Sequence, residues 1–292
     1  MTTPQPHSAQ SLEWTVGGRT FRLDFSKPLV MGIINVTPDS FSDGGRHLLP
    51  QDAVAQARRH LAEGADILDI GAETTRPGSD PVPADEEWRR LAPVLAGLAS
   101  LPPTPVSVDT YKAEVADRAL TAGASMINDV YAGRQDPEIL RVVARRGAPI
   151  VLMHMKGEPK TMQDDPVYDD VVAEVREFLL ERAEAAMAAG VPKERIILDP
   201  GLGFGKTAVH NLTLLKRFDE VIPAGFHSLM ALSRKGFLGR ILNVSVPSQR
   251  DLATAAANAL AVLKGAEIIR VHNVAPSLEA SRVAFAARRE AI

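Results

Sequence analysis

Charged and amide side chains recur in this sequence at one kind of position, immediately after a short apolar run. The sharpest junction joins the run at residues 30–34 to NVTPDSFSDGG at 35–45, which begins with Asn35. Later runs end in the same way at Asp109, Asn128 and Asp199. Buried strands that end repeatedly in such residues are typical of a barrel with its chemistry on one face.

The two aspartates suit a ligand that presents paired N–H donors. A carboxylate can accept two parallel donors, as it does from a guanidinium group. Because a buried carboxylate without a partner is costly, we expect water or a neighbouring cation beside Asp109 or Asp199 when no ligand is bound. An aspartate at a strand end can instead cap the next helix. This alternative is weaker for Asp199, before Pro200-Gly201, than for Asp109, before Thr110.

Basic side chains near the end of the chain suit an anion. Arg270 and His272 occupy alternate positions of the last apolar run, so their side chains should point to the same side. Barrels commonly bind phosphate groups near the ends of strands seven and eight. Lys235 follows the seventh run, and its neighbour Arg234 should point the opposite way. A lone Ser-Arg-Lys is usually solvated, so only its companions make Lys235 a candidate site residue.

Alternating strands and helices must position these side chains. We expect eight strands, at residues 30–34, 67–70, 106–108, 126–127, 150–153, 196–198, 229–232 and 268–271. Segments of helical period lie between them, at 52–63, 84–98, 112–122, 137–146, 168–189 and 251–264, and several end at a glycine. Continuously apolar strands in this order favour a parallel sheet covered by helices. The pattern predicts an α/β fold, a closed (β/α)8 TIM barrel. An open doubly wound sheet is the alternative, but the early GxGxxG turn that accompanies it is absent from the sequence.

The amino-terminal segment has a different pattern. Apolar and polar residues alternate over 12–25 around Gly17-Gly18, as in a β-hairpin whose two-residue turn needs positive φ angles. We expect this hairpin to cover the bottom of the barrel, after a flexible segment at residues 1–10. The whole chain, 1–292, is then one barrel domain.

Composition excludes several kinds of chemistry. The 292 residues include no cysteine, so disulfides, thiolate catalysis and Cys-ligated metals are ruled out. A net charge of −3 argues against nucleic acid as a partner. The polar first ten residues have no signal-peptide core, and no apolar stretch reaches the roughly 18 residues of a membrane span. We therefore expect a cytoplasmic protein without membrane contact.

Eight motifs, taken in order, point to a known family. They are NVTPDSFSDGG at 35–45, ETTRPG at 73–78, VDT at 108–110, IND at 127–129, LMHM at 152–155, DPGLGFGK at 199–206, SRKG at 233–236 and RVHNV at 270–274. Together they closely resemble the dihydropteroate synthase family, over about residues 29–274. The resemblance implies a (β/α)8 barrel that joins a dihydropterin diphosphate to 4-aminobenzoate and releases pyrophosphate, with Mg²⁺ as cofactor.

The resemblance also assigns roles to residues. Asp199 would hold the amino and N3 side of the pterin, while Asp109 and Asn128 reach other ring nitrogens. Lys235 would donate to the ring carbonyl or a ring nitrogen, with Ser233 beside it. The other residues expected at the pterin are Met153, Phe204 and Arg270, the first two as apolar walls.

The remaining roles concern the leaving group and the second substrate. Arg270, His272 and Arg76 would bind pyrophosphate, and Asn35 would be the protein ligand of Mg²⁺. The 4-aminobenzoate would lie among Phe41, Thr75, Pro77 and Lys235. Because this amine is an aniline and needs no strong base, we expect departure of pyrophosphate to be the harder step. The hypothesis is a dissociative substitution in which Asp109 and Asp199 favour a cationic ring.

Some residues depart from the family pattern or invite another interpretation. Ala72 and Thr74 replace the usual glycine and serine, and Asn273 stands where aspartate is frequent. GLGFGK at 201–206 is one residue too short for a P-loop, so its glycines should allow close packing at the pterin. His154 has no nearby partner for zinc.

The sequence leaves two other functions open, and the resemblance suggests an oligomeric state. A pterin-dependent methyltransferase would use a similar barrel but needs no pyrophosphate site, and a non-catalytic paralogue would bind pterin without turnover. The resemblance implies a homodimer through late helices, with a face at 253–261 or 277–287. The alanine-rich segment could equally be a close-packed internal helix.

Overall fold

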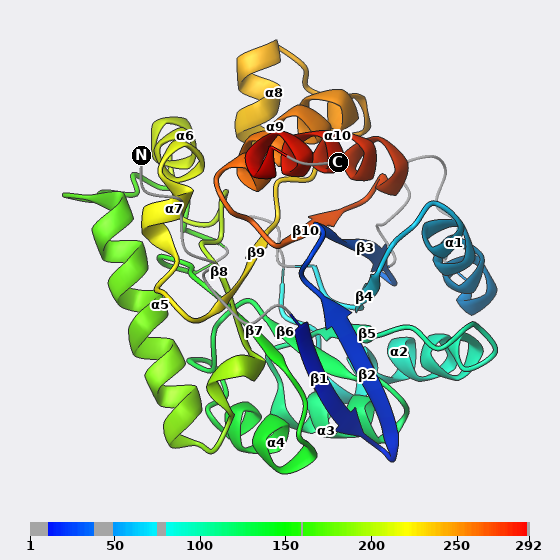
Figure 1. Cartoon of the computed structure of the whole chain (residues 1–292). Helices are drawn as coiled ribbons and strands as arrows, with labels where there is room; N and C mark the ends of the chain where they lie inside the picture. Colours follow the sequence, from blue (N-terminus) through cyan, green and yellow to red (C-terminus); the bar gives the residue numbers. More distant parts are fainter. Residues whose placement is uncertain (1–10, 38–48, 75–79, 159, 291–292) are drawn as a thin grey trace.

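Eight parallel strands close into a barrel in the order β10-β3-β4-β5-β6-β7-β8-β9, with helices around them (Figure 1). This computed structural model describes residues 11–37, 49–74, 80–158 and 160–290. The first barrel strand pairs with the last, Val30 beside Ile269, and this pairing closes the sheet. The predicted (β/α)8 barrel is therefore confirmed, and the open doubly wound alternative is wrong.

The strands match the predicted apolar runs, with one shift. β9 begins and ends two residues before the predicted 229–232, because two polar residues hide its start. His227 Nδ1 lies 3.0 Å from Glu267 Oε2, and the Ser228 N–H donates to the same oxygen at 3.0 Å. The barrel strands are β3 Leu29–Asn35, β4 Ile67–Gly71, β5 Val106–Asp109, β6 Met126–Asp129, β7 Ile150–Met153, β8 Ile196–Asp199, β9 His227–Met230 and β10 Ile268–Val271.

The predicted helices are present within a few residues of their expected ends. Gly147 ends α4 in the left-handed region, at φ 68°, as the glycine pattern predicts. The start of α5 comes later than expected, because Asp170 caps it by accepting the N–H of Val172 at 2.9 Å. The helices are α1 Pro50–Ala62, α2 Ala84–Leu98, α3 Ala113–Thr121, α4 Glu138–Arg146, α5 Val171–Ala188, α6 Ala208–Lys216, α7 Phe218–Val221, α8 Gly236–Leu242, α9 Asp251–Leu263 and α10 Val274–Arg289.

The amino-terminal hairpin covers the end of the barrel where the strands begin. β1 (Ser11–Val16) and β2 (Arg19–Asp24) are antiparallel and turn at Gly17 and Gly18, with φ 57° and 75° (Figure 1, dark blue). The buried Trp14 donates from Nε1 to the carbonyl of Ser125, the residue before β6, at 2.8 Å. The predicted position of the hairpin is therefore confirmed.

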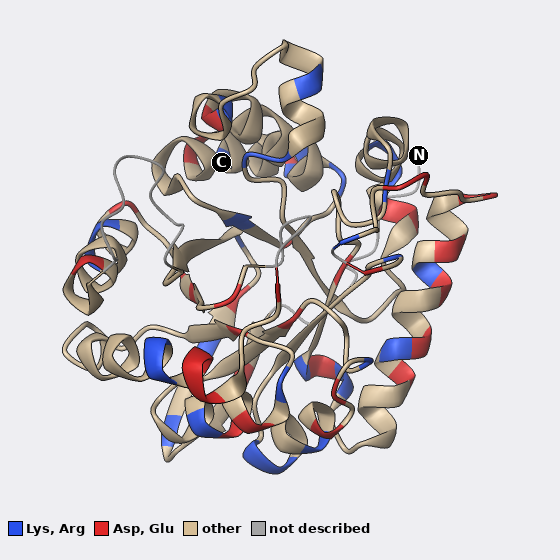
Figure 2. Cartoon of the chain, turned by 180° about the vertical axis from the view of Figure 1, so that it is seen from behind, with Lys and Arg blue, Asp and Glu red and all other residues tan. Residues whose placement is uncertain are grey.

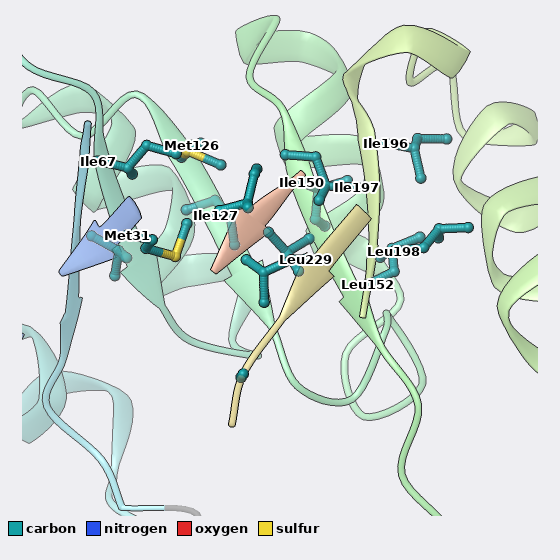
Figure 3. Close-up of a cluster of buried hydrophobic side chains, with 14 of the residues drawn as sticks. Met31, Ile67, Met126, Ile127, Ile150, Leu152, Ile196, Ile197, Leu198 and Leu229 are labelled. Atoms are coloured by element: carbon teal, nitrogen blue, oxygen red, sulfur yellow. The ribbon is translucent and has the colours of Figure 1, made fainter. Parts of the chain in front are cut away.

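Apolar side chains of the barrel strands form a buried cluster (Figure 3). Met31 pairs with Ile67, and Leu229 with Ile268, so neighbouring strands bring apolar residues together. The strands carry apolar residues on both faces because helices cover the outside. Among the residues described, no helix is both long and apolar enough to cross a membrane.

Candidate active site

The register of the strands brings the predicted polar side chains to one mouth. Asn35 lies beside Gly71, Gly71 beside Asp109, and Asp109 beside Asn128. On the next two strands, β7 and β8, Met153 and Asp199 are paired in the same manner. Because paired residues of parallel strands point to the same face, these positions share the interior of the barrel at its carboxyl end. Figure 2, the view opposite the hairpin, shows acidic and basic segments around the centre of the barrel.

Arg270 joins two aspartates inside this mouth. Its Nε donates to Asp69 Oδ2 at 2.6 Å, and its Nη2 donates to Asp109 Oδ2 at 2.8 Å. Asn128 Nδ2 lies 3.4 Å from the same oxygen of Asp69. Asp69 is fully buried, and the guanidinium compensates a charge that would otherwise be costly. The expected cation beside Asp109 is therefore present, and it is Arg270.

Burial raises the pKa values of the acidic side chains at this mouth and lowers the pKa of a basic one. It raises the pKa of Asp109 to about 7, with a further rise from Asp69 and an opposing effect of Arg270. It also raises the pKa of Asp199, against the Gly201 N–H and the charge of Lys235. Burial lowers the pKa of Lys235 to about 8, although the charge of Asp199 opposes this. Shifted groups gathered in one mouth are typical of a functional site.

The helix-capping alternative is wrong for Asp109. The helix that follows begins at Ala113, with Lys112 as its N-cap, while the carboxylate of Asp109 pairs with Arg270. Asp199, where capping was the weaker alternative, accepts the N–H of Gly201 at 2.7 Å through Oδ1. This bond closes a turn rather than a helix.

Lys235 lies against the glycine-rich loop after β8. Its Nζ is 4.2 Å from the ring centroid of Phe204, and a β-carbon at Gly203 would lie 3.1 Å from its Cδ. Phe204 packs on a small apolar cluster that includes Met153. The other two glycines of the loop lie close to backbone: a β-carbon at Gly201 would lie 1.9 Å from the carbonyl oxygen of His154.

His272 is linked to the end of β9. Its Nδ1 lies 2.8 Å from Ser233 Oγ, and its N–H donates to the same oxygen at 3.0 Å. Arg234, between Ser233 and Lys235, turns to Asp251, as the alternation of side chains predicted. Lys235 and His272 thus belong to adjacent strand ends.

The sequence reasoning missed two buried residues at this mouth, Asp69 and Lys206. Asp69 stands inside the apolar run ILDI at 67–70, and a charge inside a buried strand is a signal that could have revealed it. Lys206 is 1% exposed, and its Nζ lies 2.8 Å from His154 Nδ1, 2.9 Å from the Gly201 carbonyl and 3.0 Å from the Phe204 carbonyl. Burial lowers the pKa of Lys206, and burial with the Lys206 charge lowers the pKa of His154 to about 2. His154 is therefore a neutral partner of Lys206.

Several expected site residues lie outside the described part of the chain. These are Phe41, Thr75, Arg76 and Pro77. Just before the last three, the Ala72 carbonyl accepts from Arg90 Nη1 at 2.9 Å, and Glu73 pairs with Lys112 and with the hydroxyl of Tyr111. Within the described ranges, no group of three or more His, Asp or Glu could hold a metal ion.

A closed α/β barrel with buried carboxylates, an amide and basic side chains at one mouth defines an enzyme that binds a small polar molecule there. Residues 31–272 match the model of the family described as pterin binding enzyme. The dihydropteroate synthase of Escherichia coli K12 is 46% identical over 261 residues, which cover 89% of this chain and 92% of that protein. The chain therefore belongs to the pterin binding enzymes and, within them, to the dihydropteroate synthase family.

Solved structures agree with this assignment. The Yersinia pestis dihydropteroate synthase, in complex with a sulfonamide drug, has a TM-score of 0.88 and 44% identity, covering 95% of this chain and 100% of that one. The Xanthomonas albilineans enzyme with 4-aminobenzoic acid has a TM-score of 0.86 and 46% identity, covering 98% and 99%. The same enzyme in complex with 7,8-dihydropteroate has a TM-score of 0.84 and 45% identity, covering 95% and 99%.

The bonds of Lys206 predict a large contribution to stability. Lys206→Met should lower the free energy of unfolding by about 3 kcal/mol, because two carbonyls and a histidine lose a buried hydrogen-bond donor. Urea unfolding followed by circular dichroism measures this. Lys216→Met on the exposed side of α6 is the control and should change the value by less than about 0.5 kcal/mol. An equal effect of both substitutions would show that Lys206 does not hold the loop.

Proposed function

We propose that this chain joins 7,8-dihydropterin-6-ylmethyl diphosphate to 4-aminobenzoate, giving 7,8-dihydropteroate and pyrophosphate. The family, the dihydropteroate synthases at 44–46% identity and the ligands in their structures support this reaction. The observation that carries the proposal is the mouth itself, where the half-buried Asp109 pairs with Arg270 and the buried Asp199 lies near the charge of Lys235. A pterin edge of N–H donors beside a carbonyl needs this combination of acceptors and donors.

The proposed pterin contacts follow from this placement. Asp199 accepts the amino and N3 protons, and Asp109 and Asn128 contact other ring nitrogens. Arg270 lies beside Asp109, where it can face the ring while keeping its bond to Asp69. Lys235 donates to the carbonyl side, with Met153 and Phe204 as apolar walls, and the 2% exposure of Asp199 keeps water from competing for the ring.

Departure of pyrophosphate is the step for which we propose electrostatic catalysis. Arg270 and His272 bind the leaving group from the end of β10, and Arg76, outside the described residues, is a third candidate. Asn35 fits as the protein ligand of Mg²⁺, because one neutral amide oxygen suits an ion held mainly by phosphate and water. When bound, Mg²⁺ would neutralise charge that develops on pyrophosphate. Phe41, Thr75 and Pro77, with Lys235, remain the proposed aminobenzoate contacts.

Release of pyrophosphate tests the proposed reaction directly. Release should require both substrates and Mg²⁺, stop on addition of EDTA, and accompany formation of dihydropteroate. Asp199→Asn should lower kcat/KM about 100-fold, or about 3 kcal/mol, because an amide is a poor acceptor for two N–H donors. Asp219→Asn, on α7, is the control and should retain activity.

Other outcomes would select the alternatives. Pterin binding without any product would favour the non-catalytic paralogue and direct attention to Ala72, Thr74 and Asn273. Transfer of a methyl group without release of pyrophosphate would favour the methyltransferase.

The raised pKa of Asp109, about 7, predicts a pH effect on kcat/KM for the pterin substrate. Loss of the Lys235 charge should lower kcat/KM above about pH 8. Below about pH 7 the free enzyme carries a neutral Asp109, so kcat/KM should also fall there as the pH decreases. Asp109→Asn should have lower activity and lack this inflection, while keeping any that belongs to the substrate. The same inflection in both proteins would exclude Asp109 as its source.

We also propose that the chain is a homodimer that works in the cytoplasm. Large exposed apolar side chains gather on α6, α8, α9 and α10, helices that lie together at the top of Figure 1: Val209, Leu212, Ile241, Leu242, Leu252, Leu260, Leu263 and Val283. Within the segments expected to form an interface, 253–261 and 277–287, several small residues such as Ala257, Ala261 and Ser277 are buried, whereas Leu260 and Val283 are exposed. The exposed larger side chains are therefore the better candidates for the contact surface.

Light scattering after size-exclusion chromatography tests the dimer. Leu252, at 84% exposure, is the most exposed of these residues, and Leu252→Glu should shift the chain towards a monomer. Leu180→Glu, on α5, is the control and should leave the mass unchanged. A monomeric unsubstituted chain, or a dimer insensitive to Leu252→Glu, would contradict the proposed surface.

A further inference from the structure

Arg234 has a backbone conformation that is unfavourable for a residue with a β-carbon. Its φ is 57°, in the left-handed region, and it stands between Ser233 and Lys235. Such a conformation persists only where the surrounding structure holds it in place, and it is concentrated near functional sites. The turn at Arg234 leaves Ser233 beside His272 and Lys235 over Phe204.

The residues at the start of α9 bind the N–H, the carbonyl and the guanidinium of Arg234. The N–H of Arg234 donates to Thr254 Oγ1 at 3.0 Å, and its carbonyl accepts from Arg250 Nη1 at 3.0 Å. Its guanidinium makes a two-pronged pair with Asp251, from Nε to Oδ1 at 2.7 Å and from Nη2 to Oδ2 at 2.8 Å. This geometry is the strong form of an arginine–carboxylate pair.

Asp251 also binds the end of the last strand. Asn273, the residue after His272, donates from Nδ2 to Asp251 Oδ2 at 3.1 Å. Burial raises the pKa of Asp251, but hydrogen bonds from Arg234 and Asn273 more than offset burial and hold the pKa below its ordinary value. One carboxylate therefore connects the loop after β9 to the residue after β10.

We propose that Asp251 is a positioning residue for the pyrophosphate side of the mouth, acting through Arg234 and Asn273. It sets the spacing between Ser233 and Lys235 on one strand end and Arg270 and His272 on the other. The inference rests on the proposed function and adds three residues that do not themselves contact a substrate. The hydrogen bond that joins Asp251 to the residue after His272 needs a donor at position 273.

The asparagine at position 273 suits this role. An amide can donate to Asp251, whereas an aspartate there would bring a second carboxylate against the first and compete for Arg234. The side chain that departs from the family pattern thus keeps a single negative charge in the cluster. Removal of a charge beside His272 also leaves the anion side more positive.

Calorimetric binding of inorganic pyrophosphate, with Mg²⁺ present, tests the proposal without turnover. Asp251→Asn should weaken pyrophosphate binding about tenfold, and Asn273→Ala about threefold, because the cations lose their fixed spacing. Asn273→Asp should also weaken it. Binding of a pterin without the diphosphate should change less than about twofold in each variant, since Asp109 and Asp199 are untouched.

A matched pair elsewhere supplies the control. Asp117 accepts two bonds from Arg146 between α3 and α4, at 2.8 and 3.0 Å, in the same two-pronged geometry. Asp117→Asn should leave both ligands' binding unchanged. Asn273→Ala deletes only one hydrogen bond and keeps the test available if Asp251→Asn fails to fold.

The outcomes separate the inference from the proposed function. Equal weakening of pyrophosphate and pterin binding, or a loss of thermal stability with unchanged pyrophosphate binding, would show that the cluster is merely structural. If the unsubstituted chain binds no pyrophosphate, the proposed function fails and the inference with it. Pyrophosphate binding that survives both Asp251→Asn and Asn273→Ala overturns the inference alone.

Discussion

A guanidinium held between two carboxylates is the interaction on which the mouth of this barrel depends. Arg270, on β10, reaches Asp69 on β4 and Asp109 on β5 within 2.8 Å. Removal of the arginine would leave two acidic side chains uncompensated in the barrel, and removal of either aspartate would release the arginine. Because Asn128 also lies near Asp69, the orientation of four side chains is coupled through one cation.

The acidic and basic side chains of the same mouth could pair with a ligand in place of their partners in the protein. Burial favours the neutral form of Asp109 and of Lys235, and only the opposite charges beside them support ionisation. A planar ligand with donors and an acceptor on one edge would give these side chains the hydrogen-bond partners that the protein alone supplies only in part. A cation already held near the proposed pyrophosphate site would lower the cost of organising that site when the ligand arrives.

Prediction from the sequence was most successful where a polar residue directly follows an apolar run. The runs that end at Asp109, Asn128 and Asp199 all became strands with these residues at the mouth. It was weaker where a polar residue stands inside a buried segment: the start of β9 was hidden by His227 and Ser228, whose partner Glu267 lies 40 and 39 residues away. Asp69 was missed for the same reason, since Arg270 comes from another strand. Lys206 is bound by two carbonyls of its own loop and by His154, 52 residues earlier.

The sequence by itself determined the order of strands and helices, the turn glycines of the hairpin and which residue types stand at the strand ends. These properties depend on neighbours within a few positions, through the alternation of side chains, helical period and the φ angles that glycine allows. Only the tertiary structure decided that Arg270 pairs with Asp69, 201 residues earlier, and that Asp251 connects Arg234 to Asn273. Those contacts exist because β10 closes the barrel against β3, and the register of that closure brings together side chains that no local spacing relates.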